Sequence, residues 1–550
     1  MVRGNNKAAG TIPVGRVQSD LSRKNTQRHL LFRVPLRRLH ICWFKRDLRV
    51  DDNRALHAAA AGVRADAEQG RAASLICLYC FEPTLLNQPE HDPSHAEFVR
   101  ASLRELRGAL RKIGSDLAVR FKDMPAALDE FDRPDEIGSL HAHQETGLAA
   151  SYERDKSVAR WCSARSIPFV EHQQHGVVRP LASRDGWARR WDRRMAEPCA
   201  DAPRELPPPP PGLRVGRIPS LRSLNLPRSE RDLAQPAGER EGLATLDSFL
   251  EVRSRRYRTA MSSPVTAADE CSRLSAHLAY GTVSLRRVHQ RTQNRAAEVG
   301  DDFGPRSEWA LSMRSFAKRL RWHCHFMQKL EDEPSIEFHN FSRAYDGLRT
   351  EDSRHWTDQE HERFRAWAEG RTGYPMIDAC MRCLHRTGWI NFRMRAMLVS
   401  FAAYHLWLHW RPVAQHLARV FLDYEPGIHY SQCQMQSGTT GINTVRIYSP
   451  IKQVADQDPS GVFIRRWLPE LTGVPDENLA EPHRMDPMTQ HFARCAIGED
   501  YPAPIVDHRR AYKEARDRIF SLRKNPAARA EADRVQRKHG SRRRPRQPRA

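Results

Sequence analysis

The chain has 550 residues, 40% of them hydrophobic and 28% charged, enough to bury a large core and to form two or three globular domains. The longest apolar stretch, residues 397–410, contains two histidines and is shorter than the roughly 20 residues of a membrane-spanning helix, so we expect no membrane span. Eleven cysteines are too few for a disulfide scaffold, and we predict a cytoplasmic, monomeric protein with reduced thiols. Cys380 and Cys383 are spaced as in a metal site, but no second pair follows at the spacing of a zinc set, so we predict no metal.

Most of the net charge of +22 lies at the two ends of the chain. Residues 1–39 carry nine Arg or Lys and one Asp, and residues 523–550 carry eleven Arg or Lys and two acidic residues. We predict a disordered basic extension over residues 1–37, although an Arg-rich organellar presequence would look similar. We also predict a disordered basic tail over residues 523–550, where little apolar content offsets the entropy of ordering. Such ends can contact phosphates without sequence selectivity, or can be solvated and have no partner.

Residues 38–170 alternate between strand-like and helix-like segments. Apolar runs over residues 39–44 and 72–81 enclose a helix-compatible segment over 53–67. A helical pattern over residues 94–113 is then followed by a third, shorter apolar run. Strands that alternate with helices predict a parallel sheet, and therefore an α/β domain over residues 38–170. No GxGxxG turn follows the first strand, so the sequence does not indicate an ordinary dinucleotide site there.

A linker is predicted over residues 171–242. It is rich in proline from residue 198, with an unbroken row at Pro207–Pro211, and this composition favours an extended chain. Residues 243–522 are predicted to form an all-α domain, because segments with helical periodicity are separated there by Gly, Pro and Asp. These segments are residues 243–252, 274–293, 308–330, 376–386 and 392–410.

The sequence Cys271-Ser272-Arg273-Leu274-Ser275 has two interpretations. Its hydroxyl and backbone donors and its Arg can hold a phosphate at the start of a helix that runs through Leu285. The same residues are also an ordinary serine-rich N-terminal cap. The five residues alone do not decide between the two.

Two further groups of residues can be either structural or functional. Tryptophans are dense over residues 309–410, where they can pack in a core, stack on a planar ring or relay electrons. Arg393 and Arg395, followed by Asp423 and Glu425, can form surface ion pairs. They can also form a buried set in which an Arg stabilises an anionic cofactor and a carboxylate holds that Arg in place. The apolar neighbours of these residues favour burial.

Five stretches of sequence, taken in order, resemble the photolyase and cryptochrome family over about residues 38–520. They are HICWFKRDLR at 40–49, SRLS at 272–275, TGYPMIDA at 372–379 with TGW at 387–389, RIYSP at 446–450, and DPSGVFIRRWLP at 458–469. The resemblance implies a Rossmann-like α/β antenna domain followed by an all-α C-terminal domain that binds FAD in a folded shape. It also implies an antenna chromophore in the first domain, whose identity the sequence leaves open.

The resemblance assigns roles to individual residues. Tyr257 and the loop from Cys271 to Ser275 are expected to contact FAD. Arg395 and Asp423 are expected to pair beside the isoalloxazine ring, with Glu425 close by. His429 falls where a residue near the flavin N5 atom is expected, and a histidine there can exchange a proton near neutral pH.

The chain departs from the family at the surface that would face damaged DNA. Arg319 stands where the enzymes for cyclobutane dimers have a lesion-binding Glu, although the tryptophan three residues further on is retained as Trp322. Phe392 stands where those enzymes have an Asn and the enzymes for 6-4 photoproducts have a catalytic His. A further lesion-facing Trp is replaced by Met435. We expect Arg319, Trp322, Phe392 and Met435 to face DNA, with Arg319, Trp322 and His429 as catalytic candidates.

The electron relay of the family also differs in this chain. The resemblance places its distal and middle tryptophans at Trp356 and Trp410, but the flavin-proximal position is Cys433. Photoreduction of the flavin therefore needs a substitute aromatic residue. We predict Trp407, which lies one helical turn before Trp410, for this role.

Two functions are compatible with these features. One is a DNA photolyase, a carbon–carbon lyase that repairs pyrimidine dimers or 6-4 photoproducts by electron transfer from light-excited reduced flavin. The basic ends and Trp322 favour it, with damaged DNA as the partner. The other is a cryptochrome-like blue-light receptor without turnover, favoured by Arg319 and Phe392. We favour repair, because an Arg in the lesion cavity can still contact the phosphates of a lesion.

Overall fold

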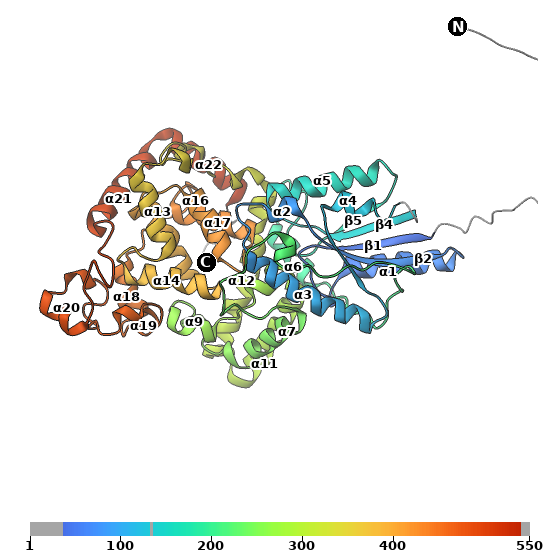
Figure 1. Ribbon diagram of the computed structural model, residues 1–550, viewed down its shortest axis with the longest axis horizontal. Helices are drawn as coiled ribbons and strands as arrows, with labels where there is room; N and C mark the ends of the chain where they lie inside the picture. The colour runs from blue at the N-terminus through green and yellow to red at the C-terminus, as the bar shows by residue number, and fades with distance from the viewer. Residues whose placement is uncertain (1–36, 133–135, 541–550) are drawn as a thin grey trace, which may run out of the picture. The chain divides into compact units, whose positions relative to one another are not determined.

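The computed structural model describes residues 37–132 and 136–540 (Figure 1). Its first part is built on a parallel sheet with the strand order β3-β2-β1-β4-β5. The strands are β1 (Arg38–Phe44), β2 (Ala73–Phe81), β3 (Leu117–Phe121), β4 (Glu136–His143) and β5 (Phe169–His172). Because the order reverses on either side of β1, the carboxyl ends of β1 and β4 lie at the switch point where doubly wound sheets form their ligand crevices.

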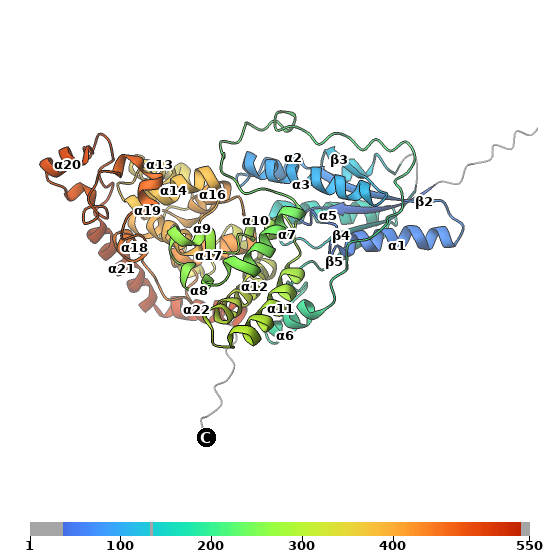
Figure 2. The same cartoon turned by 90° about the horizontal axis from the view of Figure 1, so that it is seen from below.

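Helices cover both faces of this sheet (Figures 1 and 2). They are α1 (Arg54–Glu68), α2 (Pro83–Leu86), α3 (Pro93–Lys112), α4 (Met124–Leu128) and α5 (Ala149–Ser163). Local signals set where two of them begin. The side chain of Asn53 accepts a hydrogen bond from the backbone of Leu56, and Asp92 forms a capping box with His95. The strands and helices of this domain match the predicted alternation, and the predicted α/β class is confirmed.

The predicted linker contains a helix, α6 (Trp187–Ala196), which precedes its proline-rich part. Trp187, Trp191 and Met195 recur at helical spacing and are buried in a core shared with α11 and α12, introduced below. Four arginines lie between these apolar residues. The average composition of the segment is therefore polar and does not indicate a buried helix. The proline-rich part is extended. It pairs with the edge strand β3 through Val119 and Val215, and then runs past α3 before it reaches α7 (Figure 2).

The second part of the chain is helical, as predicted. Its helices are α7 (Glu239–Ser248), α8 (Tyr257–Ala260), α9 (Pro264–Glu270), α10 (Ser275–Ala279), α11 (Leu285–Phe303), α12 (Glu308–Asp332), α13 (Asp358–Glu369), α14 (Pro375–Thr387), α15 (Phe392–Ser400), α16 (Trp410–Val420), α17 (Pro426–Ser437), α18 (Pro450–Gln457), α19 (Val462–Trp467), α20 (Pro487–Ala493), α21 (His508–Lys524) and α22 (Pro526–His539). Two π-helical turns, Phe249–Arg253 and Phe401–His405, continue α7 and α15, and 3₁₀ turns lie at Arg222–Leu224, Pro334–Glu337, Arg343–Tyr345, Ser353–His355, Pro469–Leu471 and Pro482–Arg484. The long helix α12 packs against both α11 and α17.

The prediction of a disordered tail from residue 523 is wrong up to residue 540. Residues Pro526–His539 form α22, whose Val535 is fully buried against Leu330, Ile336 and Phe341. His539 lies 2.6 Å from Glu333, which anchors the last turn of α22 to the end of α12. A few tertiary contacts thus order a segment whose own composition is mostly charged. Residues 541–550, and the predicted extension up to residue 36, lie outside the described residues.

The described part of the chain has neither a candidate membrane span nor a candidate metal site. No helix within residues 37–132 and 136–540 is long and apolar enough to cross a membrane. Over the same residues, no group of His, Cys, Asp and Glu side chains is arranged to hold a metal ion.

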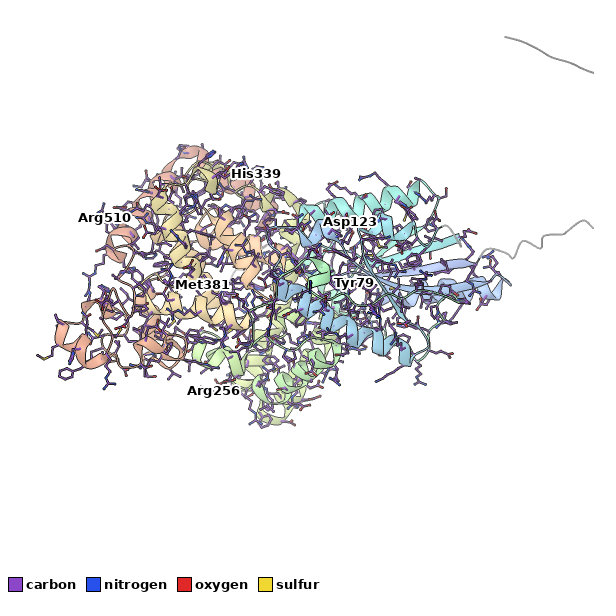
Figure 3. The ribbon with its side chains drawn as sticks, in the orientation of Figure 1. Tyr79, Asp123, Arg256, His339, Met381 and Arg510 are labelled. Atoms are coloured by element: carbon purple, nitrogen blue, oxygen red, sulfur yellow. The ribbon has the colours of Figure 1, made fainter. Side chains whose placement is uncertain are left out.

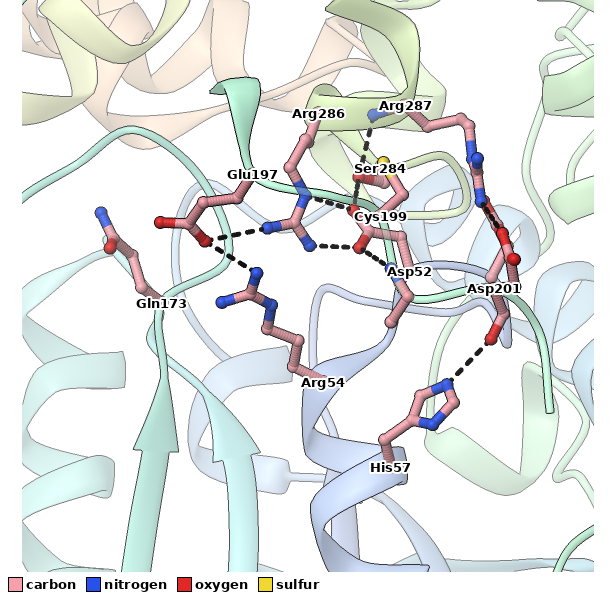
Figure 4. Close-up of polar contacts among 12 residues, drawn as sticks. Asp52, Arg54, His57, Gln173, Glu197, Cys199, Asp201, Ser284, Arg286 and Arg287 are labelled. Atoms are coloured by element: carbon pink, nitrogen blue, oxygen red, sulfur yellow. Dashed lines mark hydrogen bonds and ion pairs between the residues drawn. The ribbon is translucent and has the colours of Figure 1, made fainter. Parts of the chain in front are cut away.

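A buried ion pair joins the turn after β1 to the start of α11 (Figure 4). Nε of Arg286 donates to the Asp52 carboxylate at 3.1 Å, a second guanidinium nitrogen contacts the other carboxylate oxygen, and the Ser284 hydroxyl donates to the same group. Both charged side chains are only 2% exposed. Burial by itself would raise the pKa of Asp52, but the bonds from Arg286 and Ser284 lower it to about 2. Asp52 is therefore ionised throughout the physiological pH range.

We expect Asp52→Ala to destabilise the protein by about 3–5 kcal/mol, the cost of leaving a buried charge unpaired. Asp52→Asn should cost less, because an amide keeps hydrogen bonds and tolerates the left-handed backbone at this residue, where φ is 48°. Asp201→Ala is the matched control, since that carboxylate also pairs with an arginine, Arg287, but is 92% exposed. Denaturant unfolding measures all three, and equal losses for Asp52→Ala and Asp201→Ala would contradict the assignment.

A row of histidines lies under α1 on one face of the sheet. His40 bonds to Asp66 at 2.9 Å and to Ser139 at 2.7 Å, and Ser139 bonds to His141 at 2.9 Å. His141 then contacts His172 through ring nitrogens 3.2 Å apart. A bond between two imidazoles needs one donor and one acceptor, so at least one of the two rings must be neutral, and protonating both rings breaks the contact. Burial lowers the pKa values of His141 and His172 from 6.5 to about 4.

We expect the free energy of unfolding to fall as the pH drops from 6.5 towards 4. Over this window the unfolded chain takes up protons on these histidines and the folded chain does not, so acid favours unfolding. Denaturant titrations at pH 7.5 and pH 5 measure the effect. His141→Asn should be less stable at pH 7.5 but lose part of the pH dependence, and an unchanged dependence would count against this assignment.

Candidate functional site

The centre of the helical domain holds a buried ion pair between α15 and the loop before α17. Nη1 and Nη2 of Arg395 donate to the two carboxylate oxygens of Asp423 at 2.9 and 2.8 Å, and Nε donates to the carbonyl of Ile390 at 2.8 Å. The guanidinium lies over the ring of Phe421 at 4.2 Å. Burial would raise the pKa of Asp423, but the charge of Arg395 outweighs it and keeps that pKa below its usual value. The predicted pairing of these two residues is present.

Several buried polar atoms around this ion pair have unused hydrogen-bonding capacity. Within residues 37–132 and 136–540, Asn391 Oδ1, Arg393 Nε and Glu425 Oε1 have no hydrogen-bond partner. Buried polar groups are normally hydrogen-bonded, so a cluster of such atoms fits a polar ligand. The atoms offer both donors and acceptors, as a flavin ring with its carbonyls and ring nitrogens requires.

The loop from Cys271 to Ser275 lies on the same side of the helical domain as Tyr257. Tyr257, Cys271 and Leu274 belong to one buried core, and the hydroxyl of Tyr257 has its pKa raised by burial and lowered in part by the charge of Arg319. Arg273 has a φ of 59° and stacks over the ring of Trp389 at 4.0 Å. The expected helix through Leu285 is interrupted: α10 ends at Ala279 and α11 begins at Leu285, with the tight turn at Gly281 between them. Ser272 therefore lies in a loop, and Ser275 lies at the start of a single helical turn.

Arg46 was not singled out from the sequence, although it lies within the HICWFKRDLR segment. It follows β1 and donates to the carbonyls of Ala279 and Tyr424, both at 2.7 Å, and lies 3.3 Å from Glu425. Burial raises the pKa of Glu425 to about 7, although the charge of Arg46 opposes this rise. Arg46 thus connects the carboxyl edge of the sheet to the loop that carries Asp423.

Two family models match most of the folded chain. Residues 316–521 match the FAD binding domain of DNA photolyase, and residues 40–202 match DNA photolyase. The chain belongs to the photolyase and cryptochrome family. Its helical domain is accordingly an FAD-binding domain, and FAD is a cofactor that the polar atoms around Arg395 fit.

Relatives within this family carry different activities in their names. A cryptochrome DASH of Gloeobacter violaceus is 29% identical and the match covers 85% of this chain and 93% of the relative. A deoxyribodipyrimidine photo-lyase of Alkalihalophilus pseudofirmus is 25% identical, over 87% of this chain and 97% of the relative. The structure of a bacterial class III photolyase from Agrobacterium tumefaciens is 23% identical, covers 90% of this chain and 100% of its own, and superposes with a TM-score of 0.76, which shows the shared fold.

His429 of this photolyase-family protein is held as a neutral ring. Its Nε2–H donates to the carbonyl of Ala414 at 2.8 Å, so Nδ1 keeps its lone pair. Burial lowers its pKa to about 4, below the near-neutral range of the expected proton exchange, and that exchange stays a prediction. Cys433 lies one turn further along α17, with Sγ 3.7 Å from His429 Nε2, and burial raises the pKa of its thiol.

The tryptophans predicted for the relay have very different surroundings. Trp410 is fully buried and donates to Asn340 at 2.8 Å, and Trp356 is 8% exposed in the same core. Trp407 instead lies between two guanidinium groups, with Arg349 at 4.5 Å and Arg518 at 4.7 Å from its ring centre. Two cations against its faces disfavour a further positive charge on the indole. Trp407 is therefore a poor donor, and this electrostatic argument opposes the predicted substitution.

The residues predicted to face DNA are exposed to different extents. Trp322 and Phe392 are 51% and 50% exposed, whereas Met435 is half-buried on α17, which packs against α15. The guanidinium of Arg319 lies 5.6 Å from the ring centre of Trp322. The structure thus brings Arg319, Trp322 and the buried Tyr257 together, while Phe392 reaches the surface from the start of α15.

We predict that Arg395→Ala lowers the FAD content of the purified protein, because Arg395 is the paired cation at the centre of the flavin site. Hydrogen bonds to charged groups contribute about 1.5–3 kcal/mol, so FAD affinity should fall by about tenfold to a hundredfold. Arg386→Ala is the matched control, since Arg386 forms a similar pair with Asp232 on the surface, where both side chains are about half exposed. Flavin absorbance per protein and the Kd for added FAD give the result, and wild-type values for Arg395→Ala would refute the assignment.

Proposed function

We propose that this protein is a DNA photolyase, which binds ultraviolet-damaged DNA on its helical domain and restores the bases with light. The observation that supports this proposal most is the exposed indole of Trp322 beside Arg319, above the core that contains Tyr257. Tryptophan side chains are usually buried, and an exposed one with a cation against it is suited to stack on an extruded base.

A basic surface lies along α8 and the part of α12 that precedes this tryptophan. We call it the α8–α12 surface, and it consists of the exposed side chains Arg255, Arg256, Arg258, Arg314, Lys318 and Arg319. Arg258 lies on α8, and Arg255 and Arg256 directly precede it, with Arg256 labelled in Figure 3. Because α8 packs against α12, these arginines lie on the same side as the cations of α12. Such a surface attracts the phosphates of DNA without selecting a sequence. The surface reaches Trp322 through Arg319, which supports phosphate contacts beside a base stacked on the indole.

Bound FAD supplies the electron that splits a pyrimidine dimer or a 6-4 photoproduct. The protein then has two tasks, and each fits residues already described. Arg395, fixed by Asp423, provides a positive charge in a site of low dielectric constant, which stabilises an anionic flavin. Trp322 provides a stacking face for the base that must leave the duplex.

A cryptochrome-like blue-light receptor is the second candidate. It is supported by the side chains at the lesion-facing positions, because Arg319 replaces a carboxylate and Phe392 replaces an amide or imidazole expected from the repair enzymes. Neither Arg319 nor Phe392 can accept a hydrogen bond from a base. A receptor would bind FAD equally well and would not turn over damaged DNA.

Repair by chemically reduced holoprotein tests the proposal. The flavin is reduced with dithionite, and the protein is illuminated with oligonucleotides that carry either a cyclobutane dimer or a 6-4 photoproduct. We expect restoration of at least one lesion. Failure to restore either lesion, with fully reduced flavin and bound DNA, would contradict the repair function. The blue-light receptor would then be the remaining candidate.

Trp322→Ala in the same assay separates stacking from charge. Base–aromatic stacking contributes about 1–3 kcal/mol, so affinity for damaged DNA should fall by about tenfold while affinity for undamaged duplex changes little. Phe492→Ala, on α20, is the control, because Phe492 is also a strongly exposed aromatic side chain, at 77%.

A further inference from the structure

The position between His429 and Trp410 is occupied by a tyrosine. Tyr430 is completely buried on α17, next to His429 in the chain. Its ring lies edge-on to Trp410, with centroids 6.1 Å apart at 80°, and its centroid lies 5.6 Å from that of His429. Tyr430 is therefore in contact with both the residue expected beside the flavin and the middle tryptophan of the predicted relay.

The hydroxyl of Tyr430 has a buried proton acceptor. It donates to Oε1 of Glu90 at 2.6 Å, and Glu90 is only 3% exposed. Glu90 comes from the turn between α2 and α3 in the α/β domain, so the bond crosses from one domain to the other. Gln415 donates to the same oxygen at 3.3 Å and fixes the carboxylate in place. A donor–acceptor distance of 2.6 Å is within the range for direct proton transfer.

We propose that Tyr430, with Glu90 as its proton acceptor, is the residue that donates an electron to the light-excited oxidised flavin in place of the missing third tryptophan. In this step one electron leaves the Tyr430 ring for the flavin and the phenolic proton moves to the Glu90 carboxylate. The products on the protein are a neutral tyrosyl radical and a neutral carboxylic acid. A thiol reductant from solution later returns one electron, and the proton returns from Glu90.

Other residues at this site fit the role less well. The Cys433 side chain is a buried thiol without a hydrogen-bonded carboxylate, and it offers no aromatic ring. Trp407 lies between Arg349 and Arg518, so its oxidation would place a third positive charge between two cations. Oxidation of Tyr430 creates no net charge on the ring, because its proton leaves with the electron. Trp410, against the outer edge of Tyr430, and Trp356 lie in the same core and offer a route to the surface for the returning electron.

The proposal rests on the flavin photochemistry of the proposed function, and radical spectroscopy tests it separately from repair. Purified holoprotein with oxidised FAD is illuminated, frozen and examined by electron paramagnetic resonance, with and without ring-deuterated tyrosine. We expect a neutral tyrosyl signal that narrows on deuteration. In Tyr430→Phe the signal should vanish, and flavin photoreduction should slow by about tenfold or more, since the proton-coupled donor is lost.

Glu90→Gln tests the proton acceptor. The amide keeps a hydrogen bond to Tyr430 but cannot take its proton at neutral pH, so photoreduction should slow and its solvent deuterium isotope effect should shrink. Tyr404→Phe is the matched control, because Tyr404 is a buried tyrosine in another core whose hydroxyl has no hydrogen-bond partner in the described chain. Flavin content and Tm verify that each variant is folded.

Two outcomes would overturn the proposal: a tyrosyl signal that persists in Tyr430→Phe, or a wild-type rate of photoreduction in that variant. Repair by dithionite-reduced flavin needs no relay, so Tyr430→Phe should repair lesions as the wild type does. Loss of repair in every form, with the Tyr430 signal intact, would therefore remove the repair function and leave the relay standing.

Discussion

The buried pairing of Asp52 with Arg286 is the constraint on which the site depends. Removing two charges from water costs several kcal/mol for each ion, and the structure offsets that cost only when Asp52, Arg286 and Ser284 are all in place. Such a pair adds little net stability, but any other arrangement of the two domains would leave its charges buried and unpaired. Arg286 lies in the first turn of α11, and α11 packs against α12. The ion pair therefore fixes the helix that carries Arg319 and Trp322 relative to the sheet.

Arg46 repeats this arrangement closer to the flavin site. It reaches from the end of β1 to the carbonyls of Ala279 and Tyr424, so one guanidinium holds both the end of α10 and the loop of Asp423. Its charge also faces Glu425, whose pKa is raised to about 7 because burial outweighs that attraction. The doubly wound sheet thus contributes to the flavin site through the residues after β1. This is the edge at which α/β sheets usually bind ligands.

The sequence predicted those features that short segments determine. Alternating apolar runs set the strands and helices of the first domain, and the family resemblance of short motifs predicted the pairing of Arg395 with Asp423 that the structure contains. Features that depend on distant residues were missed. Val535 orders α22 by contacting Leu330 and Phe341, nearly two hundred positions earlier in the chain. The cations beside Trp407 and the carboxylate beside Tyr430 likewise come from remote segments, and no local pattern indicates them. Their roles toward the flavin and DNA stay predictions.

The surface that we propose for damaged DNA combines strong charge with little capacity to recognise a base. Arg319 and the other cations of the α8–α12 surface attract phosphates equally on any sequence. Phe392 and Trp322 present apolar faces, which stack on every base and distinguish few of them. Selection of damage by such a surface has to come from the DNA itself. A lesion unstacks at lower cost than an intact pair, so the same stacking energy extrudes the damaged base and leaves the normal one in the helix.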